Sequence, residues 1–199
     1  MKGARKSRTE WEIMSNEDKV LKEVYSSFEQ RLSFDDFQSK LNSLTIDKWN
    51  FVRATLLYQQ YLKCKECNPN VGMVLLCSCA DALQLVAEDR LSKANFMEFY
   101  LRYCPAYLRT HSPIDYYKDG KLPRATAPFE KALHFIYKQF RCLYVHKGIG
   151  HLETAPLEDT AWHTLLDRIK GEKDVYAVDL PIISEWFGQI TFESLFAML

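Results

Sequence analysis

The segment 71–90, "VGMVLLCSCADALQLVAEDR", constrains the fold of this chain more than any other. It is apolar on nearly every face of a helix, so other elements must cover that helix on all sides. The flanking segments can supply this cover, because their apolar residues recur every three or four positions and capping residues precede them. Leu outnumbers Val and Ile together, and only 7 Gly and 7 Pro occur in 199 residues, which favours helix over sheet.

These patterns predict an all-α bundle of about seven or eight helices, with no sheet of three or more strands. Asn16, Ser33, Thr45 and Asn70 are the expected caps of the first four helices. The stretch "VYAV" at 175–178 could form a short strand, but it has no obvious partner. We expect one compact unit, in which a helical extension over 1–44 packs on a helical domain over 45–199. The expected helices cover roughly 16–28, 33–41, 46–66, 70–90, 92–103, 126–148, 156–171 and 181–199.

The charges of the chain are balanced overall but unevenly distributed. A net charge of zero argues against a general nucleic-acid coating protein. Residues 93–150 nevertheless hold ten Lys and Arg against four Asp and Glu, whereas residues 151–199 hold three against nine. An anionic ligand should therefore meet the middle of the chain. No apolar run approaches the roughly 18 residues of a membrane span, and the basic N-terminus lacks the apolar run of a signal peptide, so we expect a cytoplasmic protein without a membrane partner.

The 6 cysteines raise the question of a metal site, because "CKEC" at 64–67 and "CSC" at 77–79 resemble zinc-binding patterns. In a helix, however, Cys77 and Cys79 point about 200° apart and cannot bind one ion. We therefore expect buried thiols, with no metal and no cofactor. A zinc-stabilised interaction protein is the least favoured of three functional hypotheses.

Residues 105–125, "PAYLRTHSPIDYYKDGKLPRA", form a long connection with three prolines. Connections of this length are often functional, and cations interleaved with aromatic rings suit single-stranded RNA. A surface insertion without function would have the same composition. The candidate RNA contacts are Arg109, Lys118, Lys121, Arg124, Tyr116 and Tyr117.

The stretch "RCLYVHKGIGH" at 141–151 follows an amphipathic helical pattern and sets Arg141 five residues before His146. About 60 residues earlier, the apolar segment contains Asp81 in "SCADAL". This combination resembles the HEPN superfamily, particularly its Apea-like branch, over roughly residues 45–199. The motif residues that match are Tyr137, Arg141, Val145, His146 and, one position late, Gly148. Cys142 and Lys147 depart from the family's pattern.

The resemblance implies a metal-independent RNA endonuclease, such as a toxin or defence effector. It also implies a homodimer whose two motifs share a cleft, and an antitoxin partner such as a nucleotidyltransferase. The expected catalytic residues are Arg141, His146 and Asp81, with Lys147 as a further phosphate contact. A histidine can move a proton to or from a ribose oxygen, and an arginine can stabilise charge on phosphate.

Two points remain open at this stage. On an α-helix, positions i and i+5 lie about 140° apart, so Arg141 and His146 share no face unless the helix loosens or a dimer combines two motifs. The alternative function is a non-catalytic module that binds a nucleotide, RNA or a protein partner. A surface arginine and a histidine at a helix C-terminus would give the same sequence pattern.

Overall fold

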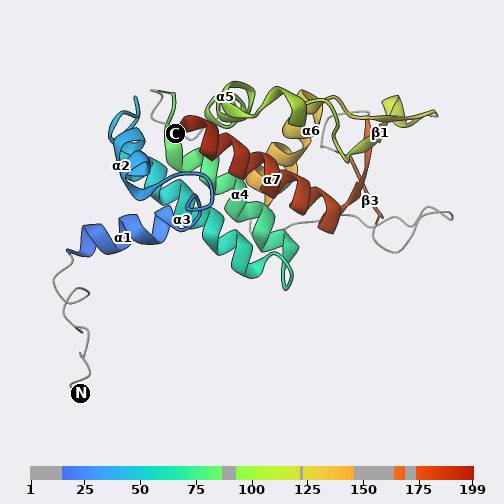
Figure 1. Cartoon of the computed structure of the whole chain (residues 1–199). Coiled ribbons are helices and arrows are strands. Elements are labelled where there is room, and N and C mark those ends of the chain that lie inside the picture. Colours follow the sequence, from blue (N-terminus) through green and yellow to red (C-terminus); the bar gives the residue numbers. More distant parts are fainter. Residues whose placement is uncertain (1–14, 87–92, 122, 146–163, 169–173) are drawn as a thin grey trace, which may run out of the picture. The chain divides into compact units, whose positions relative to one another are not determined.

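A computed structural model describes residues 15–86, 93–121, 123–145, 164–168 and 174–199 (Figure 1). These residues form seven α-helices, a π-helix and a small antiparallel sheet, so the expected all-α class is confirmed. The chain divides into two compact units, Met1–Ser43 and Leu44–Leu199. The packing of the first unit on the second stays a prediction.

The first unit contains α1 (Asn16–Tyr25) and α2 (Phe34–Asn42). Ser15 rather than Asn16 caps α1, and Ser33 caps α2 as expected; both hydroxyls accept a backbone N–H three residues ahead. Four aromatic rings hold the unit together, with the Tyr25 and Phe34 centroids 5.2 Å apart and the Phe28 and Phe37 centroids 5.9 Å apart.

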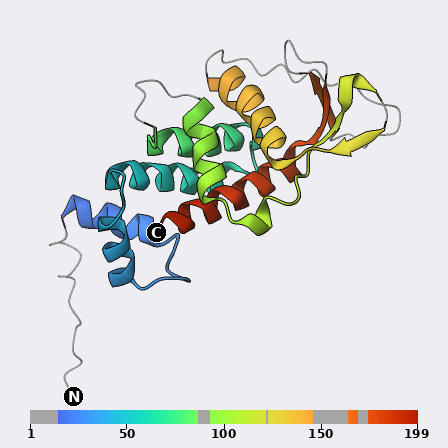
Figure 2. The same cartoon turned by 90° about the horizontal axis from the view of Figure 1, so that it is seen from above.

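The second unit is a bundle built around α4 (Figure 2). Helix α4 packs against α3, α5, α7 and the π-helix η3, and it buries residues on several faces, as its all-round apolar pattern requires. The helices of this unit are α3 (Lys48–Cys64), α4 (Pro69–Leu83), α5 (Lys93–Tyr103), α6 (Phe129–Ile136) and α7 (Leu180–Met198), and η3 spans Tyr137–Val145.

Four further expected helix ends are corrected. The sixth helix begins at Phe129 rather than at residue 126, because Arg124–Thr126 is a strand. Asp47 rather than Thr45 caps α3, and Asn68 rather than Asn70 caps α4, because Pro69 already occupies the first helical position. Helix α4 ends at Leu83, well before residue 90. Gln84 adopts the left-handed conformation there, and the Asn95 side chain accepts the Leu85 N–H and donates to the Ala80 carbonyl.

The expectation of no sheet with three or more strands is wrong. Four strands pair antiparallel in the order β2-β1-β4-β3: β1 (Asp115–Tyr117), β2 (Arg124–Thr126), β3 (Thr164–Arg168) and β4 (Val175–Asp179). The isolated strand over "VYAV" thus has two partners, with Tyr176 opposite Tyr116 on one side and opposite Asp167 on the other. Tyr176 also stacks on Phe135 of α6, with ring centroids 4.6 Å apart, which ties the sheet to the bundle.

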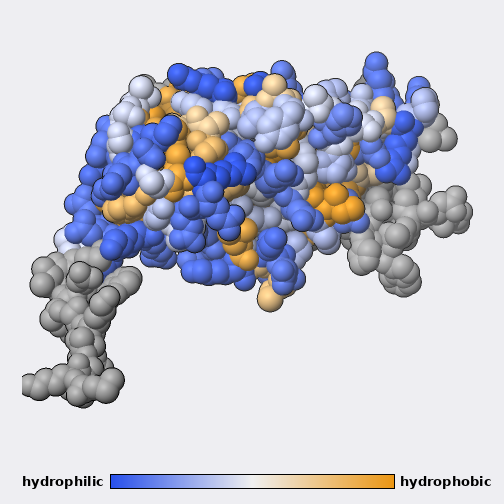
Figure 3. Space-filling view, in the orientation of Figure 1, coloured by the Kyte–Doolittle hydropathy of each residue, from blue (hydrophilic) through white to orange (hydrophobic). Residues whose placement is uncertain are grey.

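The helix expected over 156–171 is wrong for Thr164–Arg168, which is β3. Its two leucines fit either a helix or a strand, because a short apolar run does not distinguish the two. The other residues of that range lie outside the described residues. In the described part of the chain, no helix is long and apolar enough to cross a membrane. Figure 3 shows a face that is largely hydrophilic, with patches of apolar side chains.

Candidate functional site

Two of the expected site residues meet inside the second unit. Asp81 lies on α4 and Arg141 on η3, 60 residues apart in the sequence, and Arg141 Nε donates a hydrogen bond of 3.0 Å to Asp81 Oδ2. The side chains are only 3% and 10% exposed, for Arg141 and Asp81 respectively. Arg141 was expected to act on phosphate rather than on the core. In the structure the guanidinium is buried against a carboxylate, and the role on phosphate stays a prediction.

The charge of Arg141 is stabilised by its partner. Burial by itself lowers the pKa of Arg141, but the charge of Asp81 and the hydrogen bond to it outweigh burial and raise that pKa above its ordinary value. The guanidinium therefore stays protonated. Because the partner charge is also withdrawn from water, loss of either side chain would leave an uncompensated buried charge.

The pair has aromatic and thiol neighbours. The Tyr137 ring centroid lies 5.6 Å from Arg141 Cζ, within the range of a cation–π contact. Cys77, one helical turn before Asp81 on α4, is fully buried, and burial followed by the Asp81 charge raises the pKa of its thiol. Cys77 is therefore a neutral thiol rather than a nucleophile. The sequence predicts that Cys77 is buried, but it does not predict that Cys77 lies beside the ion pair.

The helix that carries Arg141 changes its winding. Helix α6 ends at Ile136, and the chain continues directly as the nine-residue π-helix η3. A π-helix hydrogen-bonds residue i with residue i+5, so these positions lie on one face, unlike those of an α-helix. The position five residues after Arg141 is His146. His146 and Lys147 lie outside the described residues, so their expected roles stay predictions.

The candidate residues of 105–125 lie elsewhere: most are in or next to the hairpin of β1 and β2, and Arg109 contacts the last turn of α5. Arg124 forms an ion pair with Asp115 across β1 and β2, with Nε 2.6 Å from Oδ2. The Tyr116 ring lies under Lys131, with Nζ 3.7 Å from the ring centroid. Tyr117 is half-buried in β1, while Lys118 and Lys121 are exposed near the turn that follows. These residues build a hairpin rather than a loose connection.

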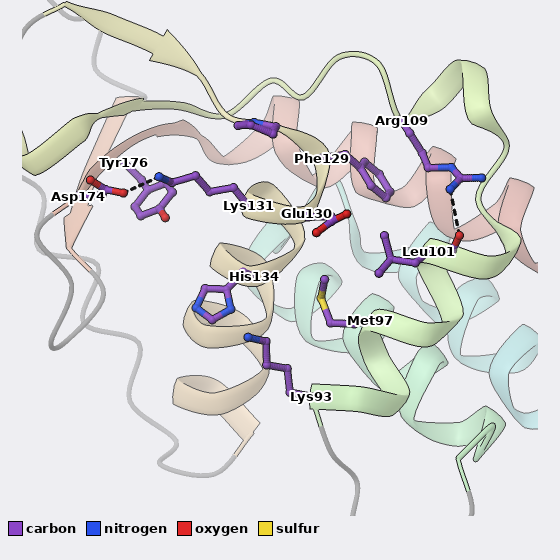
Figure 4. Close-up of a pocket in the computed structure, with 11 residues that line it drawn as sticks. Lys93, Met97, Leu101, Arg109, Phe129, Glu130, Lys131, His134, Asp174 and Tyr176 are labelled. Carbon is purple, nitrogen blue, oxygen red and sulfur yellow. Dashed lines mark hydrogen bonds and ion pairs between the residues drawn. The ribbon is translucent and has the colours of Figure 1, made fainter.

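Arg109 lies at the mouth of a groove between α5 and α6 (Figure 4). Its Nη1 donates a hydrogen bond of 3.0 Å to the carbonyl of Leu101 in the last turn of α5. The helix dipole also stabilises a cation at this end of the helix. Lys93, Lys131 and His134 line the same groove, and only Arg109 among these four was expected as a contact. Residues 93, 97 and 101 are spaced four apart, so the sequence alone indicates that they lie on one face of a helix, and this face forms one wall of the groove.

The thiols give no sign of a cluster. Cys77 and Cys79 are both buried on α4, and among the described residues no three His, Cys, Asp or Glu side chains lie close enough to hold a metal ion. Comparison of the chain with known protein families, with curated proteins and with solved structures finds no match.

Proposed function

We propose that this chain is a cytoplasmic, metal-independent RNA endonuclease of HEPN type. The observation that carries the proposal is the buried Asp81–Arg141 ion pair, which joins the central helix to the segment that runs into His146. Asp81 and Arg141, which the HEPN resemblance implies as site residues, are 60 positions apart in the sequence and are joined by one hydrogen bond. A buried ion pair loses the solvation free energy of both charges. One reason for a protein to retain such a pair is that it fixes the position of the two elements it joins.

In this proposal His146 is the catalytic residue and the ion pair positions it. His146 of one copy takes the proton of a ribose 2′-OH, and the 2′-oxygen attacks the adjacent phosphorus while the bond from phosphorus to the 5′-oxygen breaks. The protonated His146 of the second copy in the proposed dimer gives its proton to the leaving 5′-oxygen. The products are a 2′,3′-cyclic phosphate and a 5′-hydroxyl. The Asp81–Arg141 pair holds in place the segment that carries His146.

The remaining partners follow from the HEPN resemblance. A homodimer would place two copies of the η3 end beside one cleft around a two-fold axis. Single-stranded or structured RNA would be the substrate, with Lys147 and the exposed Lys118 and Lys121 as contacts to phosphate. The proposed role is that of a toxin or defence effector, with a nucleotidyltransferase as the antitoxin.

The test is RNA cleavage by the purified protein in EDTA. Wild type should cut RNA, and His146→Ala should lose activity by about two orders of magnitude or more, as for other general bases. His111→Ala, which removes an exposed histidine from the connection, is the matched control and should cut like wild type. Equal cleavage by His146→Ala and wild type would contradict the proposal.

A second candidate function is a non-catalytic module that binds a nucleotide, RNA or a protein. The 3% exposure of Arg141 favours it, because such an arginine makes no direct contact with a phosphate while it stays buried. The same assay separates the two functions, since a binding module leaves RNA intact at every protein concentration.

A further inference from the structure

The groove between α5 and α6 has the size of a binding site. Its volume is about 670 Å³, and it is an open groove rather than an enclosed cavity. Lys93, Met97 and Leu101 form one wall, because a spacing of four puts them on one face of α5. The opposite wall comes from α6, where Glu130 and His134 are also four residues apart (Figure 4).

Cations stand at both ends of the α5 wall. Lys93 is exposed on the first residue of the helix, and Arg109 is held at the other end by its hydrogen bond to the Leu101 carbonyl. Arg109 Nε is buried and has no hydrogen-bond partner among the described residues, so its N–H is left to donate a hydrogen bond to a ligand oxygen. Lys93 and Leu101 are eight residues apart, which corresponds to about 12 Å along the helix axis.

The third cation of the groove is already neutralised. Lys131 Nζ lies 2.5 Å from Asp174 Oδ2 and over the Tyr116 ring. Glu130, which is exposed, is then the main charge opposing an anionic ligand. Lys93 and Arg109 outweigh it, so the groove favours a ligand with two anionic groups.

The side chains in the middle of the groove limit the kinds of ligand that it can bind. Met97 and Leu101 are half-buried and offer an apolar surface between the two cations. The aromatic residues of the lining, Phe129 and Tyr176, are only 7% and 1% exposed, so neither offers a ring face for stacking a nucleobase. Small-molecule sites enclose most of their ligand, whereas this groove is open along its length, which suits a chain.

We propose that this groove binds an acidic, amphipathic peptide segment of a partner protein in extended conformation. In an extended chain, residues i and i+4 are about 13 Å apart and share a face with residue i+2. Acidic residues at i and i+4 would pair with Lys93 and Arg109, and an apolar residue at i+2 would contact Met97. This site is separate from the Asp81–Arg141 pair and does not depend on RNA cleavage.

The probe is an acetylated and amidated peptide with the core Glu-Ser-Leu-Ser-Glu, titrated into the ¹⁵N-labelled full chain. The control peptide, Leu-Ser-Glu-Glu-Ser, has the same composition with adjacent acids. Amide resonances of α5 and α6 should shift with the first peptide and hardly with the second. Lys93→Glu should weaken binding about five-fold or more, since it replaces an attractive charge with a repulsive one.

Two variants separate binding from folding. Lys63→Glu makes the same charge change on an exposed residue of α3, outside the groove, and should leave the affinity unchanged. Glu130→Gln removes the opposing carboxylate and should tighten binding, an effect that a folding defect cannot produce. Lys93→Glu also places an acidic residue at a helix N-terminus, which the helix dipole tolerates well.

Three results would overturn the proposal: equal binding of both peptides, unchanged affinity of Lys93→Glu, or no shift at millimolar peptide. An oligouridylate that shifts the α5 and α6 resonances when the peptide does not would assign the groove to RNA instead. Cleavage of RNA by the same samples is scored separately, so failure of one proposal leaves the other testable.

Discussion

Arg141 and Asp81 form a charged pair in a region from which water is excluded. Such pairs add little net stability over an apolar contact, but removing one partner leaves the other charge buried and unpaired. The pair also joins α4 to η3, which are distant in the sequence. Its residues therefore serve the fold as well as any chemistry.

Asp81→Ala and Arg141→Ala should each lower the free energy of unfolding by about 3–5 kcal/mol. The double variant Asp81→Leu with Arg141→Met should lose much less, because it leaves no orphan charge. Urea unfolding followed by circular dichroism measures all three. Arg102→Ala, which breaks an exposed pair with Glu98, is the control and should cost less than about 1 kcal/mol. Single variants as stable as this control would show that the buried pair does not form.

A second prediction concerns Gly188. It lies inside α7, where glycine usually costs stability, but a Cβ there would lie 2.3 Å from the Tyr61 hydroxyl. That hydroxyl donates 2.8 Å to the Ser184 carbonyl, and the Tyr61 ring is buried. Gly188→Ala should therefore destabilise the chain by about 1–3 kcal/mol despite its higher helix propensity.

Thermal unfolding of a double-mutant cycle checks this explanation. In the background Tyr61→Leu, which removes the hydroxyl and the ring, Gly188→Ala should cost little or become stabilising. An equal cost in both backgrounds would mean that Tyr61 is not the obstacle.

Some features of the site residues could be predicted from the sequence and others could not. Arg141 and Asp81 were identifiable from the motif and from the central apolar helix. Their burial was not predicted, because Arg141 was expected to contact phosphate. The spacing of Arg141 and His146 did not help, because in an α-helix these two positions lie on different faces. The π-helix has no recognisable pattern in "YKQFRCLYV", since its apolar spacing also fits α-helix.

Among the elements, the hairpin of β1 and β2 is fastened to the bundle through Asp174. One carboxylate oxygen accepts a hydrogen bond from Lys131 Nζ of α6, and the other accepts the Asp119 backbone N–H at 2.8 Å. The hydrogen bond from Lys131, with that from Asp119 second, lowers the pKa of Asp174. This carboxylate is therefore stabilised in its charged form by the fold.

This predicts a pH dependence with a defined sign. A folded pKa below the unfolded value of about 3.9 gives stability that is present above pH 4 and is lost as pH falls through the folded pKa. Asp174→Asn should cost less than about 1 kcal/mol at pH 6, and its difference from wild type should shrink as the pH falls below 4. Urea unfolding between pH 2 and 6 measures this; a difference that is constant with pH would contradict the assignment to Asp174.

Helices were more predictable than strands for a physical reason. Caps and apolar spacing are local, so α2 and α7 were placed within about a residue of their ends. The sheet depends on pairs such as Asp115 with Ala177, which only the folded chain brings together. Strands of three to five residues carry too few side chains to show a period.

In the whole molecule, the second unit is a mostly helical bundle around one apolar helix, with an ion pair inside it and a groove on its surface. The ion pair and the groove lie at different contacts, α4 with η3 and α5 with α6. We therefore propose separate roles for them, one in RNA chemistry and one in partner binding.

The most direct measurement compares two strands of identical sequence in EDTA, one all-RNA and one with a 2′-deoxyribose at each site that the protein cuts. The all-RNA strand should be cleaved to a 2′,3′-cyclic phosphate and a 5′-hydroxyl, whereas the substituted strand should stay intact, because the proposed nucleophile is the 2′-oxygen. Cleavage of the substituted strand at the same sites, or no cleavage of either strand by wild type, would contradict the proposal.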